Sequence, residues 1–124
     1  MKRKRILVVD DHPYVLAGLA GNLRRMAEFE VVLALGSEDA RQQLDQEGEF
    51  AVIIADLHMP GGDGEQLLEY VMTTYPDMRR IVLTGDSVSE QAQRVRFLCH
   101  LFLEKPCDPS DLQTAIRSTL DLAA

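Results

Sequence analysis

Hydrophobic residues gather in five short runs along the chain, and each run is apolar throughout instead of alternating with polar residues. The runs cover residues 6–9, 31–35, 51–55, 81–83 and 101–103. They are rich in β-branched side chains, and strands that are apolar on both sides are typical of a parallel sheet covered by helices on both faces. The pattern therefore predicts five buried parallel strands.

Segments with helical spacing separate or follow these runs. Residues 38–47 give the weakest prediction, and the last helix has clear start signals in Asp108 (N-cap), Pro109 (first position) and Asp111 (first turn). The predicted inward-facing residues are Leu16, Leu19, Leu23 and Met26; Ala40 and Leu44; Leu68, Val71 and Tyr75; Val88, Ala92, Val95 and Cys99; and Leu112, Ala115, Ile116 and Leu120.

Strand and helix thus alternate five times. Because crossovers between parallel strands are right-handed, this order predicts an α/β fold, a doubly wound five-stranded parallel sheet with helices on both faces. A length of 124 residues is close to the commonest size for one domain, so we expect a single domain over residues 1–124.

Charge and hydropathy exclude several classes of protein. The net charge of −7 argues against direct binding of nucleic acid, and the basic residues 2–5 are interpreted as solvated terminal residues. No apolar run approaches the length of a membrane span or of a signal peptide, so we expect a cytoplasmic protein that does not enter a membrane. Cys99 and Cys107 lack metal-ligand spacing and are expected to be free thiols.

Polar residues of the types found in catalytic and metal-binding sites follow the predicted strands. Asp10 and Asp11 follow the first, Asp56 the third, Thr84 the fourth and Lys105 the last. Ligands of open parallel sheets bind at the carboxyl ends of the strands, where these residues would meet. Carboxylates packed together repel one another unless a cation lies among them, and an all-oxygen set suits Mg²⁺, with Mn²⁺ also suitable.

The motifs themselves are specific. The pair Asp10-Asp11, the segment DLHMPGGDG at residues 56–64, the pair Thr84-Gly85 and the pair Lys105-Pro106 resemble the receiver domains of two-component response regulators. The resemblance runs from about residue 4 to about residue 122. It implies the CheY-like (flavodoxin-like) fold with strand order 2-1-3-4-5, and a bacterial signalling switch that is not a turnover enzyme.

The resemblance also implies the roles of the site residues. Asp56 would be the phosphoacceptor, taking a phosphoryl group from a phosphohistidine and losing it slowly by autodephosphorylation. Asp11, Asp56 and the backbone carbonyl of His58 would hold Mg²⁺, with Asp10 helping directly or through water. The ammonium of Lys105 would neutralise charge on the transferred phosphoryl group.

Two residues would transmit the signal. Thr84 would donate its hydroxyl to the phosphoryl group, and Phe102 occupies the position of the aromatic switch in receivers. Phenylalanine lacks the polar tip of the tyrosine or histidine often found there, and its alternative interpretation is a core residue on a buried strand.

The loop after Asp56 is the other notable segment. Pro60 would stiffen it, and Gly61, Gly62 and Gly64 permit close approach of the backbone. Receivers typically have a cis peptide before the residue at Pro106. The side chain of His58, near Asp63 and Asp86, could tune hydrolysis of the acyl phosphate, although a solvated loop histidine is the simpler interpretation.

Expected partners are a sensor histidine kinase or a histidine phosphotransfer protein, and an output domain or partner protein that binds the last two helices and the last strand. Arg94, Arg96 and Phe97 lie off the inward stripe there. Arginine and aromatic side chains suit such an interface. A homodimer that forms on phosphorylation is compatible with the same surface.

Two other functions share part of this pattern. A phosphatase of the haloacid-dehalogenase type also uses an aspartate nucleophile and Mg²⁺, but its second aspartate would stand at position 58, which is His58. A receiver-like interaction module independent of phosphorylation would have no use for the complete acidic and basic set. The sequence leaves open whether the chain is a stand-alone regulator or part of a longer protein.

Overall fold

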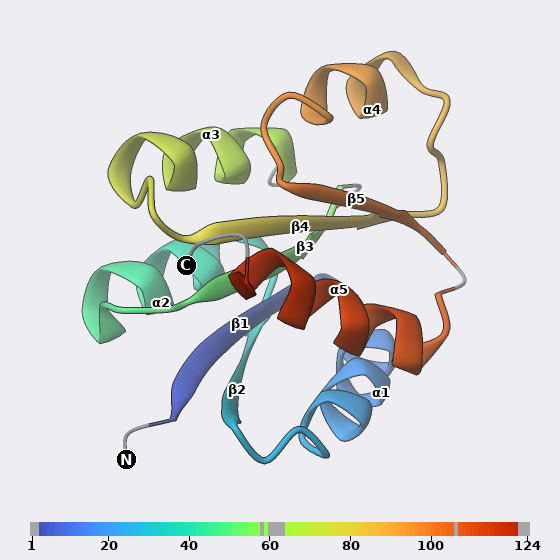
Figure 1. Ribbon diagram of the computed structural model, residues 1–124. Helices are drawn as coiled ribbons and strands as arrows, with labels where there is room; N and C mark the ends of the chain where they lie inside the picture. Colours follow the sequence, from blue (N-terminus) through green and yellow to red (C-terminus); the bar gives the residue numbers. More distant parts are fainter. Residues whose placement is uncertain (1–2, 58, 60–63, 106, 122–124) are drawn as a thin grey trace.

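Five parallel strands form one sheet in the computed structural model, which describes residues 3–57, 59, 64–105 and 107–121 (Figure 1). The strands are β1 (Lys4–Asp10), β2 (Phe29–Leu35), β3 (Val52–Asp56), β4 (Arg79–Thr84) and β5 (Leu101–Glu104). Their order in the sheet is β2-β1-β3-β4-β5, and each neighbouring pair is parallel. The predicted fold class and strand order are confirmed.

Helices cover both faces of the sheet. They are α1 (Pro13–Leu23), α2 (Ser37–Glu47), α3 (Gly64–Thr74), α4 (Glu90–Val95) and α5 (Pro109–Asp121). In Figure 1, α1 and α5 lie together on one side of the sheet, and α2, α3 and α4 lie on the other. This arrangement follows from the connections, because the crossover from β1 to β2 runs in one direction along the sheet and the crossovers from β2 to β3, β4 and β5 run in the other.

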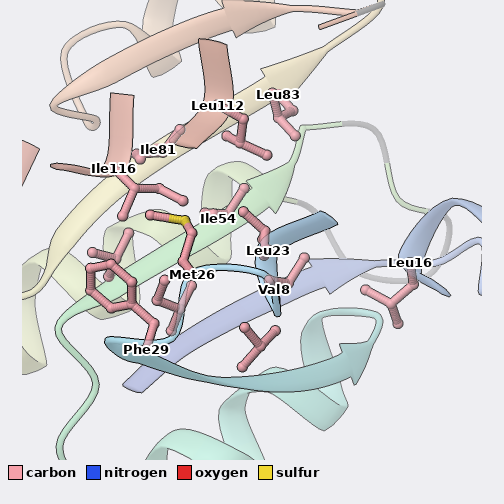
Figure 2. Close-up of a cluster of buried hydrophobic side chains, with 13 residues drawn as sticks. Val8, Leu16, Leu23, Met26, Phe29, Ile54, Ile81, Leu83, Leu112 and Ile116 are labelled. Atoms are coloured by element: carbon pink, nitrogen blue, oxygen red, sulfur yellow. The ribbon is translucent and has the colours of Figure 1, made fainter. Parts of the chain in front are cut away.

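The core has two main layers because successive strand residues point to opposite faces. Ile6 and Val8 of β1 pack with α1 and α5, whereas Leu7 and Val9 pack with α2 and α3. Figure 2 shows the first layer, in which Met26 and Ile116 lie close to the strand residues. Burial on both faces explains why the strands read as unbroken apolar runs.

The edge strands are less buried than predicted. Leu35 at the end of β2 is 52% exposed, and the residues of β5 from Leu101 to Leu103 are half-buried. An edge strand has a neighbour on one side only, so its side chains have less cover.

Helix α4 corrects one prediction. The expected stripe began at Val88 and ended at Cys99, but α4 contains six residues, and its buried residues are Ala92 and Val95. Val88 is 83% exposed, and Cys99 lies after the helix. The side chain of Ser89 accepts a hydrogen bond from the backbone N–H of Ala92, and with Ser89 as N-cap the helix begins at Glu90, two residues after Val88.

The predicted start of α5 is confirmed. One carboxylate oxygen of Asp108 accepts hydrogen bonds from the backbone N–H and the hydroxyl of Ser110, both at 2.9 Å. Pro109 is the first helical residue. No helix in the described part of the chain has the length and apolar character that a membrane span requires.

Candidate functional site

Three carboxylates converge at the carboxyl edge of the sheet. Asp10 ends β1 and Asp56 ends β3, and these strands are neighbours, with Asp11 following directly after Asp10. One carboxylate oxygen of each residue lies within 4.8 Å of the others. Asp10 is 2% exposed, whereas Asp11 and Asp56 are half-buried. The strand order thus brings together the acidic residues that the sequence predicted to meet.

Lys105 supplies a positive charge to this cluster. Its Nζ lies 3.0 Å from Oδ2 of Asp56 and 3.4 Å from Oδ2 of Asp10. Its backbone N–H donates to the carbonyl of Thr84 at 2.8 Å, which fixes the end of β5 beside β4. Burial lowers the pKa of Lys105, but hydrogen bonds and charge interactions with Asp56 and Asp10 outweigh burial and raise it. The ammonium therefore stays charged at neutral pH.

The donor atoms of the cluster suit a hard cation. Asp10 accepts a hydrogen bond from the backbone N–H of His12 on Oδ1 and contacts Lys105 through Oδ2. Among the described residues, three carboxyl groups gather here beside the ammonium of Lys105. Carboxylate oxygens of this kind fit Mg²⁺ or Mn²⁺, which bind oxygen ligands and relieve repulsion among them.

Thr84 lies next to this cluster with its hydroxyl engaged locally. The residue is fully buried at the end of β4. Its Oγ1 accepts a hydrogen bond from the backbone N–H of Asp86 at 3.1 Å and lies 3.4 Å from the carbonyl oxygen of Asp86. A carboxylate oxygen of Asp86 in turn accepts from the backbone N–H of Val88. The hydroxyl thus helps to hold the loop that leads from β4 to α4.

Comparison with known proteins agrees with this geometry. The sequence model of the family described as response regulator receiver domain matches residues 6–117. The chain belongs to this family.

Relatives of this receiver domain include longer response regulators. Response regulator Rre1 of Synechocystis sp. is 30% identical over 118 residues, covering 93% of this chain and 51% of Rre1. Response regulator protein PilR of Pseudomonas aeruginosa is 28% identical over 123 residues, covering 98% of this chain and 27% of PilR. The chain therefore spans about half of Rre1 and about a quarter of PilR.

A solved structure of the same family has nearly the same backbone. The CheY-like response regulator receiver domain protein from Methanospirillum hungatei has a TM-score of 0.92 and 27% sequence identity, with 98% of this chain and 97% of that chain covered. The receiver fold thus extends over essentially the whole chain.

Two glycines of the receiver domain lie beside the acidic cluster. Gly64, the first residue of α3, packs against the backbone of Asp56 and Leu57, where a side chain has no room. Gly85 has open space where a side chain would stand. The predicted need for close backbone approach therefore holds at Gly64, whereas Gly85 leaves the region after Thr84 uncovered.

The predicted aromatic switch lies on β5, away from the acidic cluster. Phe102 is half-buried, is paired with Val82 of β4 in the sheet, and packs against a small cluster that includes Ala92 and Val95 of α4. The guanidinium of Arg96 lies over its ring, 4.2 Å from the centroid. Arg96 was predicted only as part of a partner surface, and no pattern in the sequence signals this contact with Phe102.

Charged contacts between distant segments were also missed. Arg94 forms a two-point ion pair with Glu65, 29 residues earlier, and the ring of His100 contacts Arg79 and the backbone of Arg80. No local pattern signals such pairs, because they depend on how elements pack. Arg94, Arg96 and Phe97 are exposed as predicted, and Phe97 is 89% exposed.

Several predictions concern residues outside the described ones. These are the metal-binding carbonyl and side chain of His58, the roles of Pro60, Gly61, Gly62 and Asp63 in the loop, and the peptide before Pro106. Cys99 and Cys107 are free thiols, as expected.

Proposed function

We propose that this receiver domain accepts a phosphoryl group on Asp56 from a phosphohistidine of a sensor kinase or phosphotransfer protein. The observation that carries the proposal is the position of the Asp56 carboxylate, which ends a central strand, is half-buried, and lies 3.0 Å from the Lys105 ammonium with Asp10 and Asp11 alongside. A carboxylate placed in this way is accessible to a donor and surrounded by groups that handle phosphoryl charge.

The transfer is a displacement at phosphorus. A carboxylate oxygen of Asp56 forms the new bond to phosphorus while the bond from phosphorus to the donor imidazole nitrogen breaks, and the imidazole leaves with its electron pair. Lys105 remains charged and stabilises the oxygens of the phosphoryl group as negative charge gathers on them. The same residue holds Oδ2 of Asp56 before transfer, so the ammonium moves from carboxylate to phosphoryl oxygen over a short distance.

Asp10, Asp11 and Asp56 would hold Mg²⁺, together with the carbonyl of His58, and Mn²⁺ suits the same oxygen atoms. When bound, the ion supplies charge neutralisation for the phosphoryl oxygens. Asp10 is fixed for this task because the backbone N–H of His12 and the Lys105 ammonium each bind one of its oxygens. Its near-complete burial keeps its negative charge close to the other two carboxylates.

Thr84 and Phe102 would carry the signal. To donate to a phosphoryl group on Asp56, the Thr84 hydroxyl has to give up its donor contact with the carbonyl oxygen of Asp86, 3.4 Å away. The loop that leads into α4 then loses a constraint, and Phe102, next to β4 and α4, follows. The phosphoryl group shifts the equilibrium only through contacts that differ between the two states, and the Thr84 hydroxyl supplies one.

The affected surface is formed by α4, β5 and α5 and would bind an output domain or a partner protein. Rre1 and PilR, both response regulators longer than this chain, are precedents for a receiver joined to further sequence. The chain would work as one domain in the cytoplasm, with slow loss of the phosphoryl group and without direct contact to nucleic acid, consistent with its net charge of −7. A homodimer formed on phosphorylation would use the same surface.

The test uses a small phosphodonor such as acetyl phosphate with Mg²⁺ and intact-mass spectrometry. The parent protein gains one phosphoryl group, and Asp56→Asn gains none. Asp77→Asn, which changes an exposed aspartate between α3 and β4, is the matched control and is labelled like the parent. Undiminished labelling of Asp56→Asn would disprove the assignment. Rapid turnover of phosphate esters by the parent would instead favour the phosphatase alternative.

A further inference from the structure

Helix α4 packs weakly against the rest of the receiver domain. It contains six residues, and its buried side chains, Ala92 and Val95, are small. A helix of this length is not stable by itself, so its position depends on contacts with its neighbours. Two arginines at its C-terminal end, Arg94 and Arg96, make such contacts.

Arg94 connects α4 with the start of α3. Its Nε and Nη2 each lie 3.0 Å from one carboxylate oxygen of Glu65, a parallel arrangement of two hydrogen bonds that fixes direction as well as distance. Hydrogen bonding to Arg94 lowers the pKa of Glu65, so the carboxylate is charged at neutral pH. Glu65 follows Gly64, which packs on the backbone of Asp56. This ion pair therefore joins α4 to the segment beside the phosphoacceptor.

Arg96 covers the switch residue. Its guanidinium lies 4.2 Å from the ring centroid of half-buried Phe102. A phenylalanine ring has no hydroxyl to meet solvent at its exposed part, and a cation over its face supplies a polar cover instead. Arg96 and Phe102 together thus combine an aromatic ring with a polar group, as a single tyrosine would at this position.

We propose that Arg94 and Arg96 are positioning residues that hold α4 and Phe102 in the unphosphorylated arrangement, so that phosphorylation of Asp56 works against both contacts. We name the pairs Arg94–Glu65 and Arg96–Phe102 the α4 latch. The inference rests on the proposed function, because a phosphoryl group on Asp56 is the ligand that opens the latch. The path runs from Thr84 through Asp86 and the loop after it to α4.

Thermodynamic linkage determines whether loss of these contacts raises or lowers the affinity for a phosphoryl mimic. Contacts that stabilise only the resting state lower the apparent affinity for any ligand that binds the active state. Exposed ion pairs and cation–π contacts of this kind are weak, so loss of either one should raise that affinity by roughly two- to fivefold. Loss of contacts that persist in both states would leave the affinity unchanged.

The experiment measures the affinity of the full chain for beryllofluoride, a phosphoryl mimic, with Mg²⁺ by NMR titration. Arg94→Gln and Arg96→Gln are each expected to bind the mimic about two- to fivefold more tightly than the parent, with larger mimic-dependent amide shifts in α4. Arg41→Gln is the matched control, because Arg41 is exposed on α2, outside the surface of α4, β5 and α5, and its guanidinium likewise lies over an aromatic ring, 4.1 Å from the centroid of Tyr70. Equal or weaker binding by both latch variants would overturn the inference.

Two further variants separate positioning from general loosening of the fold. The double variant Glu65→Gln/Arg94→Gln should bind the mimic as tightly as either single variant, because each single change already removes the ion pair. This double-mutant cycle isolates the pairwise interaction from the other contacts of the two residues. In a Phe102→Tyr background, Arg96→Gln should change the affinity for the mimic less, because the tyrosine hydroxyl supplies a polar group to the exposed part of the ring. Fully additive effects in both cycles would overturn the inference. If the parent shows no mimic-dependent change that Asp56→Asn abolishes, the proposed function fails, and the inference fails with it.

Discussion

Gly64 approaches Asp56 so closely that a Cβ atom at Gly64 would lie 2.6 Å from the backbone carbonyl oxygen of Asp56. The same Cβ would lie 2.7 Å from the carbonyl oxygen of Leu57 and 3.0 Å from its Cα. These are backbone atoms, so relief of the contact requires movement of the chain at Asp56 and not the rotation of a side chain. The glycine at the start of α3 is therefore part of how the candidate phosphoacceptor is positioned.

Substitution of this glycine should affect both stability and chemistry. Gly64→Ala is expected to lower the free energy of unfolding by about 1–3 kcal/mol through overpacking, and to slow labelling of Asp56 by acetyl phosphate. Gly21→Ala is the matched control, because Gly21 lies in α1 with open space around it, and alanine there should raise stability by up to about 1 kcal/mol. Urea denaturation and labelling rates measure the two effects. Parent-like labelling by Gly64→Ala would show that the close contact does not position Asp56.

A divalent ion should stabilise the fold through the three carboxylates. Because Mg²⁺ would bind the native cluster of Asp10, Asp11 and Asp56 and not the unfolded chain, saturating Mg²⁺ should raise the melting temperature of the parent. Asp11→Ala should lose most of this increase, whereas Asp121→Ala, at an exposed position at the end of α5, should retain it. A parent melting temperature that does not respond to Mg²⁺ would contradict a preformed cation site.

Lys105→Gln should separate metal binding from phosphoryl transfer. Without the ammonium 3.0 Å from Asp56, the carboxylates are less neutralised, so Mg²⁺ should bind several-fold more tightly, roughly as expected for one charge at this distance in a partly exposed site. Labelling of Asp56 should nevertheless slow on the order of 100-fold, because a charge that stabilises the transferred group is gone. Calorimetric titration and labelling rates test these opposite changes, with Lys4→Gln as the control. Weaker Mg²⁺ binding by Lys105→Gln would show that the lysine organises the carboxylates instead of competing with the ion.

Much of this receiver domain could be predicted because its signals are local. Unbroken apolar runs gave the strands, and the residues after them gave the positions of Asp10, Asp56, Thr84 and Lys105. The prediction failed at α4, where apolar spacing continued to Val88 although Ser89 is the residue that caps the helix. A capping signal outranks periodicity at such a boundary, because it fixes which backbone N–H group is satisfied first.

Contacts between distant residues could not be predicted in the same way. The pair Arg94–Glu65 joins residues 29 positions apart, and Lys105 contacts Asp10 across 95 positions. The second contact followed from the topology, since both residues end strands at the same edge of the sheet. The first depends on the position of a short helix relative to α3, and no periodicity in the sequence determines that position.

His100, for which the sequence suggested no partner, joins the start of β5 to β4. The ring Nδ1 of His100 accepts a hydrogen bond from the backbone N–H of Arg80 at 3.0 Å, and the backbone N–H of His100 donates to the carbonyl of Arg80 at 2.8 Å. The Nη1 of Arg79 lies 3.1 Å from Nε2. Because Nδ1 accepts, the ring has to be neutral with its proton on Nε2, and protonation of Nδ1 would break the hydrogen bond from the backbone N–H of Arg80. Burial, with the charges of Arg80 and Arg79, lowers the pKa of His100.

A lowered histidine pKa makes stability depend on pH in one direction. In the unfolded chain, His100 takes up a proton near its ordinary pKa of about 6.5, whereas in the folded chain it does so only at lower pH. The contribution of neutral His100 to the free energy of unfolding is therefore complete above about pH 6.5 and is lost as the pH falls toward the folded pKa. The free energy of unfolding should therefore decrease from about pH 7.5 to about pH 5.5, and less so in His100→Gln. Arg79→Gln should give an intermediate slope, because it removes one of the charges that oppose protonation. NMR titration of the ring reports the pKa directly, and a His100 pKa above the ordinary value would contradict the prediction.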